Sequence, residues 1–487
     1  MAHGEYHALV ESAESSLAPY AQRSLTQDSQ SFLNGAEILK HFQDEWQTYS
    51  GQMKLSNRTP LQLERDRILY SSALRKQTEK YHVLYSDRRK VVRNYTTHTM
   101  RMAHVARTIC KALRLNSDFA EAIAIGSKVG AAPFIHVTKE TTNQWLQRRL
   151  GELDRAQPTS PKLQKSPQAT LFGDEQTAQV PTWFASLQSR DIVEQAIRWI
   201  PMARGDGVDT AYNSGAESYW LLTTDPYLRE SDRALYHPET MYGIWRHSRS
   251  VRPREASFFH QCLLNEQTQH RITWEHVTYE SVVVQFADDM TWIIENLNDA
   301  KDAALLVGGK ANLFLQMQTS LGPEAPSDVL QALALRDAGA LYTYFISDFV
   351  RNSQRVLTRP SAGPEMRMAL RTGDGTALIG PSEAAGMTLD RMQQFLVKNV
   401  FETPRIRNRN KMLQSVAQVT LDILYEEKSS LVGLVNDRAN LESWPDDRRD
   451  KAISMLDDKV HKAQLAVDVF ASMGDQEVFD FVGIESF

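Results

Sequence analysis

Hydrophobic residues recur every three or four positions along most of this chain, which is the spacing of a buried helical face. Within residues 98–115 that stripe consists of Met102, Val105, Ile109 and Leu113. His98 lies four residues before the first of these and therefore falls on the same face of the predicted helix. The two-residue alternation of half-buried strands is scarce, so the pattern predicts a mainly α protein.

A second helix is predicted to begin at Ser117, which suits the N-cap position. Phe119, Ile123 and Ser127 follow at intervals of four residues, so Ser127 is predicted to face the buried side of that helix. Residues 279–300 contain neither Gly nor Pro and predict one long helix.

The chain divides into three predicted parts. Residues 1–60 read as a helical N-terminal extension, 61–300 as a core and 301–487 as a helical C-terminal region. Within the core, residues 151–185 are rich in Pro, Ser, Thr and Gln, which is typical of a long loop or insertion.

Composition narrows the class of protein. The chain has 487 residues, of which 42% are hydrophobic and 24% charged, as in an ordinary soluble globular protein. Its two cysteines, Cys110 and Cys262, are far apart and form neither a zinc pattern nor a disulfide framework. No apolar run approaches the roughly 18 to 20 residues of a membrane span, and the N-terminus has no secretory signal. These features predict a cytoplasmic protein without a membrane partner.

Charge is unevenly distributed along the sequence. Residues 61–140 carry 15 lysines and arginines against 7 acidic residues, a local charge of +8 in a chain of net charge -5. A basic segment in an acidic chain favours an anionic ligand such as a phosphate or a nucleic acid. The alternative is a solvated helical surface whose charges form salt bridges.

Three segments between residues 65 and 136 carry the most specific sequence signal for a known family. They are RDRILYSSALRKQ at Arg65–Gln77, RNYTTHTMRMAHVARTICKALRLNSDFAEAIAIG at Arg93–Gly126 and SKVGAAPFIH at Ser127–His136. Together they resemble the dGTPase-like deoxynucleoside triphosphate triphosphohydrolases, a branch of the HD-domain hydrolases. Shorter matches follow in the family's order at Tyr212–Leu222, Met241–Ser248 and Lys411–Lys428. The resemblance implies an HD-domain helical core of the dGTPase type with helical N- and C-terminal extensions.

The resemblance also implies a metal site, and here the chain departs from the family's pattern. The family binds a divalent cation, Mg²⁺ or Mn²⁺, through a lone His, an adjacent His-Asp pair and a distant Asp. His98 matches the lone His and Asp288 the distant Asp, whereas Ser127 and Lys128 stand at the pair. A hydroxyl is a weak ligand and an ammonium repels a dication. We therefore expect metal-dependent hydrolysis to be lost or reduced, and one hypothesis is that Lys128 takes the cation's place and bonds Asp288 and a phosphate.

Further residues match the family's catalytic and nucleotide-contacting positions. His136 matches a catalytic His, and Glu140 follows a second catalytic position that holds Lys139. Besides Lys128, the candidate nucleotide contacts at aligned positions are Thr78, Trp292 and Asn296. Gln77 lies one residue before the aligned Thr78, and Arg93 lies two residues before another aligned position, which holds Tyr95. Several of them differ in type from the family's residue, so the resemblance implies nucleotide contacts that are partly retained and partly rewritten.

Three hypotheses for the function remain open. In the first, the protein binds deoxynucleotides or single-stranded nucleic acid, and its hydrolytic centre is disarmed. In the second, an atypical centre still splits a dNTP into deoxynucleoside and triphosphate, with antiviral depletion of dNTPs as one role. The third is a non-catalytic helical protein that binds protein partners. Family members commonly form tetramers or hexamers, so we expect a homo-oligomer.

Overall fold

The computed structural model of the protein describes slightly more than half of the chain. The described residues are 60–81, 93–156, 278–303, 313–357, 379–441, 449–450, 453–457 and 459–484, with the single positions 214, 218, 222, 240, 243 and 244. Of these residues 84% are helical and none lies in a strand, which confirms the predicted mainly α class.

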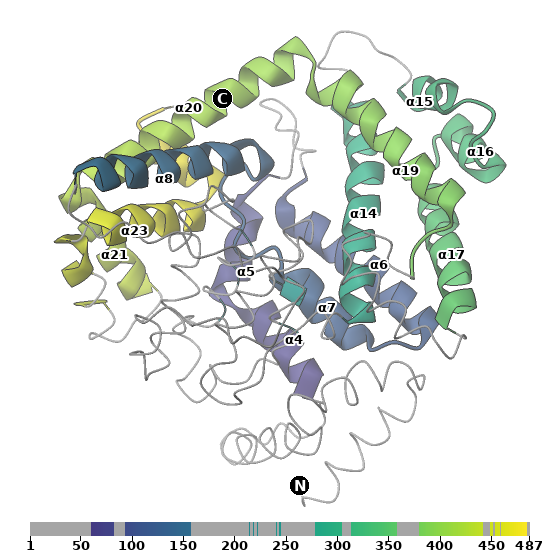
Figure 1. Cartoon of the computed structure of the whole chain (residues 1–487), viewed down its shortest axis with the longest axis horizontal. Coiled ribbons are helices and arrows are strands. Elements are labelled where there is room, and N and C mark those ends of the chain that lie inside the picture. Colours follow the sequence, from purple (N-terminus) through teal and green to yellow (C-terminus); the bar gives the residue numbers. More distant parts are fainter. Residues whose placement is uncertain are drawn as a thin grey trace, which may run out of the picture.

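Helices of three to 25 residues make up the described part, with short 3₁₀ and π turns between some of them (Figure 1). Their order is α4 (Pro60–Tyr70), α5 (Ser72–Lys76), η3 (Gln77–Glu79), α6 (Tyr95–Leu113), α7 (Ser117–Gly126), α8 (His136–Ala156), α14 (Tyr279–Ala303), α15 (Leu313–Leu321), α16 (Ser327–Leu335), α17 (Ala338–Leu357), α19 (Glu383–Leu396), η5 (Val397–Phe401), α20 (Pro404–Glu426), α21 (Lys428–Leu441), η6 (Met455–Asp457), α23 (Lys459–Ser472) and α24 (Asp475–Phe481). Among the described residues no helix is long and apolar enough to cross a membrane.

The predicted helices around the family-like segments are present. In α6 the whole predicted stripe is buried, and the Asn94 side chain caps the first turn by accepting from the backbone N–H of Thr97. The predicted cap of the next helix was wrong by one residue. Asn116 is the N-cap of α7, and Ser117 is its first helical residue. Asn and Ser are similarly good caps, so their relative position alone could not distinguish them.

A central cluster of buried side chains joins α4, α6 and α7 to α14–α17 and α19. Figure 1 shows α14 in the middle of this group, with α6 and α7 beside it. Tight packing at one point depends on glycine: a Cβ added to Gly126 would lie only 2.4 Å from Cδ1 of the buried Ile244. This contact, together with Ile68 of α4 on the same side, packs the end of α7, and therefore Ser127 and Lys128, into the central cluster.

A second, C-terminal cluster joins α8 to α20, α21, α23 and α24. Trp145 of α8 is fully buried there, and its Nε1 donates a hydrogen bond of 2.8 Å to Asp422 on α20. In Figure 1, α19 and α20 cross the top as a bent pair, with the π turn η5 between them. The pair therefore links the two clusters, because α19 packs in the central one and α20 in the C-terminal one.

The loop before α8 is held by buried charged groups. Lys80 donates to the carbonyls of Ala131 and Ala471, and Asp475 accepts from the backbone N–H groups of Phe134 (2.8 Å) and Tyr81 (2.9 Å). Phe134 and its neighbour Ile135 both have positive φ, of 55° and 47°. Such backbone is unfavourable for residues with side chains. The start of α24 thus clamps a turn that leads from Lys128 to α8.

The predicted division into parts can be followed only where residues are described. The extension 1–60 lies outside the described residues apart from Pro60. The segment 151–185 begins as helix, because α8 continues to Ala156, and the rest of it is outside the described residues. The core 61–300 and the region 301–487 stay predictions, and both clusters draw helices from either side of residue 300.

Candidate functional site

The residues at the family's metal positions come together on α6, α14 and the end of α7. Nζ of Lys128 lies 2.8 Å from Oδ2 of Asp288, and Nε2 of His98 lies 3.0 Å from Oδ1 of the same carboxylate. Lys128 therefore forms the predicted ion pair with Asp288. Ser127 is buried, as its spacing predicted, and its hydroxyl donates to the carbonyl of Ala124 at 2.9 Å.

Glu295 lies at the other side of His98 and was not predicted as a site residue. Its Oε2 is 2.9 Å from Nδ1 of His98, and its Oε1 accepts from Arg101 at 2.8 Å. Arg93 forms ion pairs with both Glu295 and Asp299. Only 1% of the Glu295 side chain is exposed, so its charge depends on these cations. Hydrogen bonds and ion pairs therefore connect a row of charged and polar side chains, which runs from Arg93 through Glu295, His98 and Asp288 to Lys128.

Burial sets the protonation of the two central groups. It lowers the pKa of His98 to about 4, although the Asp288 carboxylate acts to raise it. The ring is therefore neutral at pH 7 and carries one N–H, which it can donate to only one of its two carboxylate neighbours. For Lys128, burial acts to lower the pKa, but Asp288 and Tyr95 together raise it above its ordinary value, so the ammonium stays charged.

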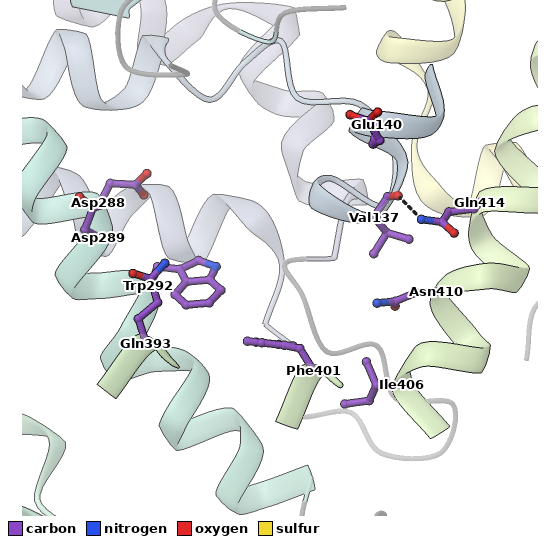
Figure 2. Close-up of a pocket in the computed structure, with 10 residues that line it drawn as sticks. All are labelled: Val137, Glu140, Asp288, Asp289, Trp292, Gln393, Phe401, Ile406, Asn410 and Gln414. Carbon is purple, nitrogen blue, oxygen red and sulfur yellow. Dashed lines mark hydrogen bonds between the residues drawn. The ribbon is translucent and has the colours of Figure 1, made fainter. Parts of the chain in front are cut away.

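A cavity of about 490 Å³ opens beside this chain of groups. Three carboxylates line it: Asp288 and Asp289 from α14, and Glu140 from α8. Trp292 and Phe401 line it as well, with ring centroids 5.4 Å apart and planes inclined by 37°. Figure 2 shows Trp292 below the two aspartates on one side and Glu140 above on the other. Asp288 thus belongs both to the ion pair and to the wall of the cavity.

The opposite wall of the cavity comes from α20. Ile406, Asn410 and Gln414 follow one another at intervals of four residues and face the cavity, as Figure 2 shows. Gln414 Nε2 donates to the carbonyl of Val137 at 3.3 Å, which ties α20 to the start of α8. Gln393 of α19 adds a third amide. These side chains offer hydrogen-bond donors and acceptors without net charge.

Asp289 is an exposed carboxyl of the cavity lining whose pKa is raised. The surrounding walls and the charge of Asp288 raise its pKa to about 6. Its carboxylate accepts from Gln285 one turn earlier, at 3.2 Å. Among the described residues the lining is acidic, since the ten that form it include three carboxylates and neither Lys nor Arg.

The remaining predicted contact residues do not all face this cavity. Gln77 is buried and donates to the carbonyl of Val129 at 2.7 Å, and Asn296 is buried and donates to the carbonyl of Trp292 at 2.8 Å. Thr78 is exposed and donates to the carbonyl of Arg75. Roles for these residues in nucleotide binding, like that of Arg93, stay predictions.

Of the two predicted catalytic residues, one lines the cavity. Glu140 is exposed, and its Oε1 accepts from Gln144 at 2.8 Å. His136 is the first residue of α8, and its side chain lies outside the described part of the structure. Their catalytic roles therefore stay predictions as well.

Many of the basic residues in 61–140 have acidic partners. Arg65 and Arg107 bind Asp118 at 2.6 and 3.0 Å, and Arg101 binds Glu295. Together with Lys128, these residues show that part of the excess positive charge of this segment is matched within the fold. This agrees with the alternative of a salt-bridged helical surface more than with a phosphate-binding surface.

The donors present do not complete a site for a divalent cation. Within the described residues no group of three or more His, Cys, Asp or Glu side chains is arranged to hold a metal ion. His98 and Asp288 are two donors, and the ammonium of Lys128 adjoins the second of them. A dication at this point would lie next to a like charge in a poorly screened environment, which is unfavourable.

Comparison with known proteins supports the resemblance over part of the chain. A deoxyguanosinetriphosphate triphosphohydrolase-like protein of Caldanaerobacter subterraneus subsp. tengcongensis is 44% identical over 93 residues, which are 19% of this chain and 27% of that protein. Similarly named proteins of Desulfatibacillum aliphaticivorans and Brucella anthropi are 46% and 41% identical over 79 and 86 residues, 16% and 18% of this chain.

These matches cover only a small part of this chain and of each relative. The chain spans about a quarter of the length of the curated relatives it matches: 27% of the first relative, 22% of the second and 21% of the third. No family model matches the chain. The similarity therefore supports a dNTP triphosphohydrolase-like origin for one segment.

Proposed function

We propose that this chain is a dGTPase-like HD protein that binds a deoxynucleotide and has lost most or all metal-dependent hydrolysis. The observation that carries the proposal is the ion pair of 2.8 Å between Lys128 and Asp288. Lys128 binds the Asp288 carboxylate that would hold the cation, and its ammonium adds a positive charge there. Ser127 offers only a hydroxyl, a weak ligand for such a cation. Without a bound dication, no water in this site is acidified for attack on a phosphate.

Binding of a deoxynucleotide is supported by the similarity to the relatives and by the adjoining cavity. Its volume of about 490 Å³ is within the range of small-molecule sites, about 300 to 1,000 Å³. Trp292 and Phe401 provide aromatic surface, and Asn410, Gln393 and Gln414 provide amides. Aromatic surface with a few polar groups is the usual lining of a site for a base and a sugar.

Hydrolysis is tested by measuring triphosphate release from each dNTP over a series of divalent ions. We expect wild-type protein to show no metal-dependent release and no tight Mn²⁺ binding. The double variant Ser127→His with Lys128→Asp restores the family's pair and should gain Mn²⁺ binding, measured by electron paramagnetic resonance. Lys128→Met is the matched control, because it removes the charge without adding ligands. Robust metal-dependent release by wild type would overturn the proposal.

Binding is tested separately by thermal shift with the four dNTPs and with single-stranded DNA, in the presence of EDTA. A ligand that binds only the folded protein stabilises it and so raises its melting temperature. At a ligand concentration of 100 times the Kd, the free energy of unfolding rises by about 2.7 kcal/mol. We expect at least one dNTP to produce such a shift. A flat response to every dNTP would contradict nucleotide binding and favour a protein-interaction role.

A further inference from the structure

The two walls of the cavity differ in charge. On the side of α14 and α8 the lining contains Asp288, Asp289 and Glu140. Lys128 lies against Asp288 and is only 8% exposed, so its charge is already matched within the wall. A triphosphate with its phosphates against this wall would meet two further carboxylates at short range, and like charges at short range repel.

Positive charge lies instead on the helix that forms the other wall. Arg407 and Lys411 each follow directly after a cavity-lining residue of α20, Ile406 and Asn410. They are four residues apart and form a row beside the lining row. Both are exposed, and Arg407 donates to the backbone carbonyl of Glu402 at 2.6 Å. This basic row is in the first three turns of a 23-residue helix whose first turn contains no acidic residue.

We propose that the cavity takes the uncharged nucleoside end of a deoxynucleotide, and that the phosphates extend outward along the basic row of Arg407 and Lys411. The inference rests on the proposed function and adds an orientation to it. The base lies against Trp292 and Phe401, and the amides of Asn410 and Gln414 contact base or sugar. The phosphates point away from Asp288 and Lys128, the residues at the family's metal positions.

This orientation lets each part of the ligand meet a suitable surface. A base has an apolar face that stacks on an aromatic ring, and its edge exchanges hydrogen bonds with amides. Phosphates gain from exposed cations and from the positive end of a helix dipole. In the opposite orientation the phosphates would face Asp289 and Glu140, and the base would leave the aromatic pair for water.

The experiment is titration calorimetry on the full chain in EDTA, with each deoxynucleoside, its triphosphate and inorganic tripolyphosphate as separate probes. The key variant is Arg407→Gln with Lys411→Gln. We expect it to weaken triphosphate binding about three- to tenfold, as for two exposed charges, and to leave nucleoside affinity within about twofold. Lys111→Gln with Arg351→Gln, which changes two exposed cations on α6 and α17, is the matched control and should change neither affinity.

Two further variants test the orientation from inside the cavity. Trp292→Ala should weaken nucleoside and triphosphate by the same factor, because both place a base on that ring. Asp289→Asn should leave the ratio of the two affinities unchanged, since the phosphates lie elsewhere. An Asp289→Asn protein that gains affinity for the triphosphate alone would overturn the orientation, as would a basic-row variant that binds triphosphate like wild type.

Failure of the orientation can be distinguished from failure of the proposed function. If a dNTP binds and the basic-row variant binds it equally well, nucleotide binding stands and the orientation is wrong. If neither nucleosides nor triphosphates bind wild-type protein, both are wrong. Salt gives an independent readout: raising ionic strength should reduce the preference for triphosphate over nucleoside, because exposed charges are screened.

Discussion

Replacing Lys128 by Met should destabilise the protein strongly, although the two side chains are similar in length. The ammonium is 2.8 Å from the Asp288 carboxylate, and the two side chains are 8% and 19% exposed. At that distance the attraction is about 6 kcal/mol for an effective dielectric constant of about 20, and the cost of desolvating both groups offsets much of it. Removing one member of a buried pair typically costs about 3 to 5 kcal/mol, because the other charge is left alone. Asp288 keeps its contact with His98 and some solvent, so we expect a loss of about 3 kcal/mol.

The assay is urea denaturation followed by circular dichroism, with Lys111→Met on the exposed side of α6 as the control. Asp288→Asn in the Lys128→Met background should recover part of the loss, because a neutral amide can still exchange a hydrogen bond with His98 without leaving a charge unpaired. A Lys128→Met variant as stable as the control would refute the reasoning. So would a double variant less stable than Lys128→Met alone.

Three other predictions concern the packing that supports the site. Gly126→Ala should lower the free energy of unfolding by about 1 to 3 kcal/mol, measured by urea denaturation, because its Cβ meets Ile244 in a filled interior; unchanged stability would contradict that packing. Burial raises the pKa of Asp475 to about 6, so its protonated form favours the fold. The stabilisation from the protonated Asp475 carboxyl is full below pH about 4 and is lost as pH rises to about 6, by up to about 3 kcal/mol. The free energy of unfolding of wild type relative to that of Asp475→Asn should therefore fall over that range. A difference that stays constant with pH would contradict this prediction. Trp145→Phe removes the hydrogen bond to Asp422 and should cost about 1 kcal/mol with little change in nucleotide affinity, whereas a large change in affinity would show that α8 does more than support the cavity.

Helical periodicity predicted much of the central part of the molecule. The stripe on α6 and the spacing of Ser127 placed His98 and Ser127 on buried faces, and both are buried. Glu295 was missed, although it lies seven residues after Asp288 and so on the same face of α14. An acidic residue on a helix is usually solvated, and only the contact with His98 distinguishes this one.

The cavity wall from α20 could not be predicted in this way. Ile406, Asn410 and Gln414 show helical spacing, but spacing does not say which distant helix they face. They reach the cavity because the π turn η5 joins α19 to α20 and the Gln414 side chain bonds the start of α8. The composition of residues 151–185 favoured a loop, whereas α8 continues to Ala156.

The clamp on the turn before α8 also sets an order of events during synthesis. The backbone N–H of Phe134 bonds a carboxylate that is 341 positions further along the chain. Two successive left-handed residues would relax toward ordinary backbone without that partner, at a gain of about 1 to 3 kcal/mol each. A nascent chain in which α24 has not yet folded therefore cannot complete this turn. The side of the cavity formed by Val137 and Glu140, which directly follows this turn, is therefore fixed only once α24 has folded.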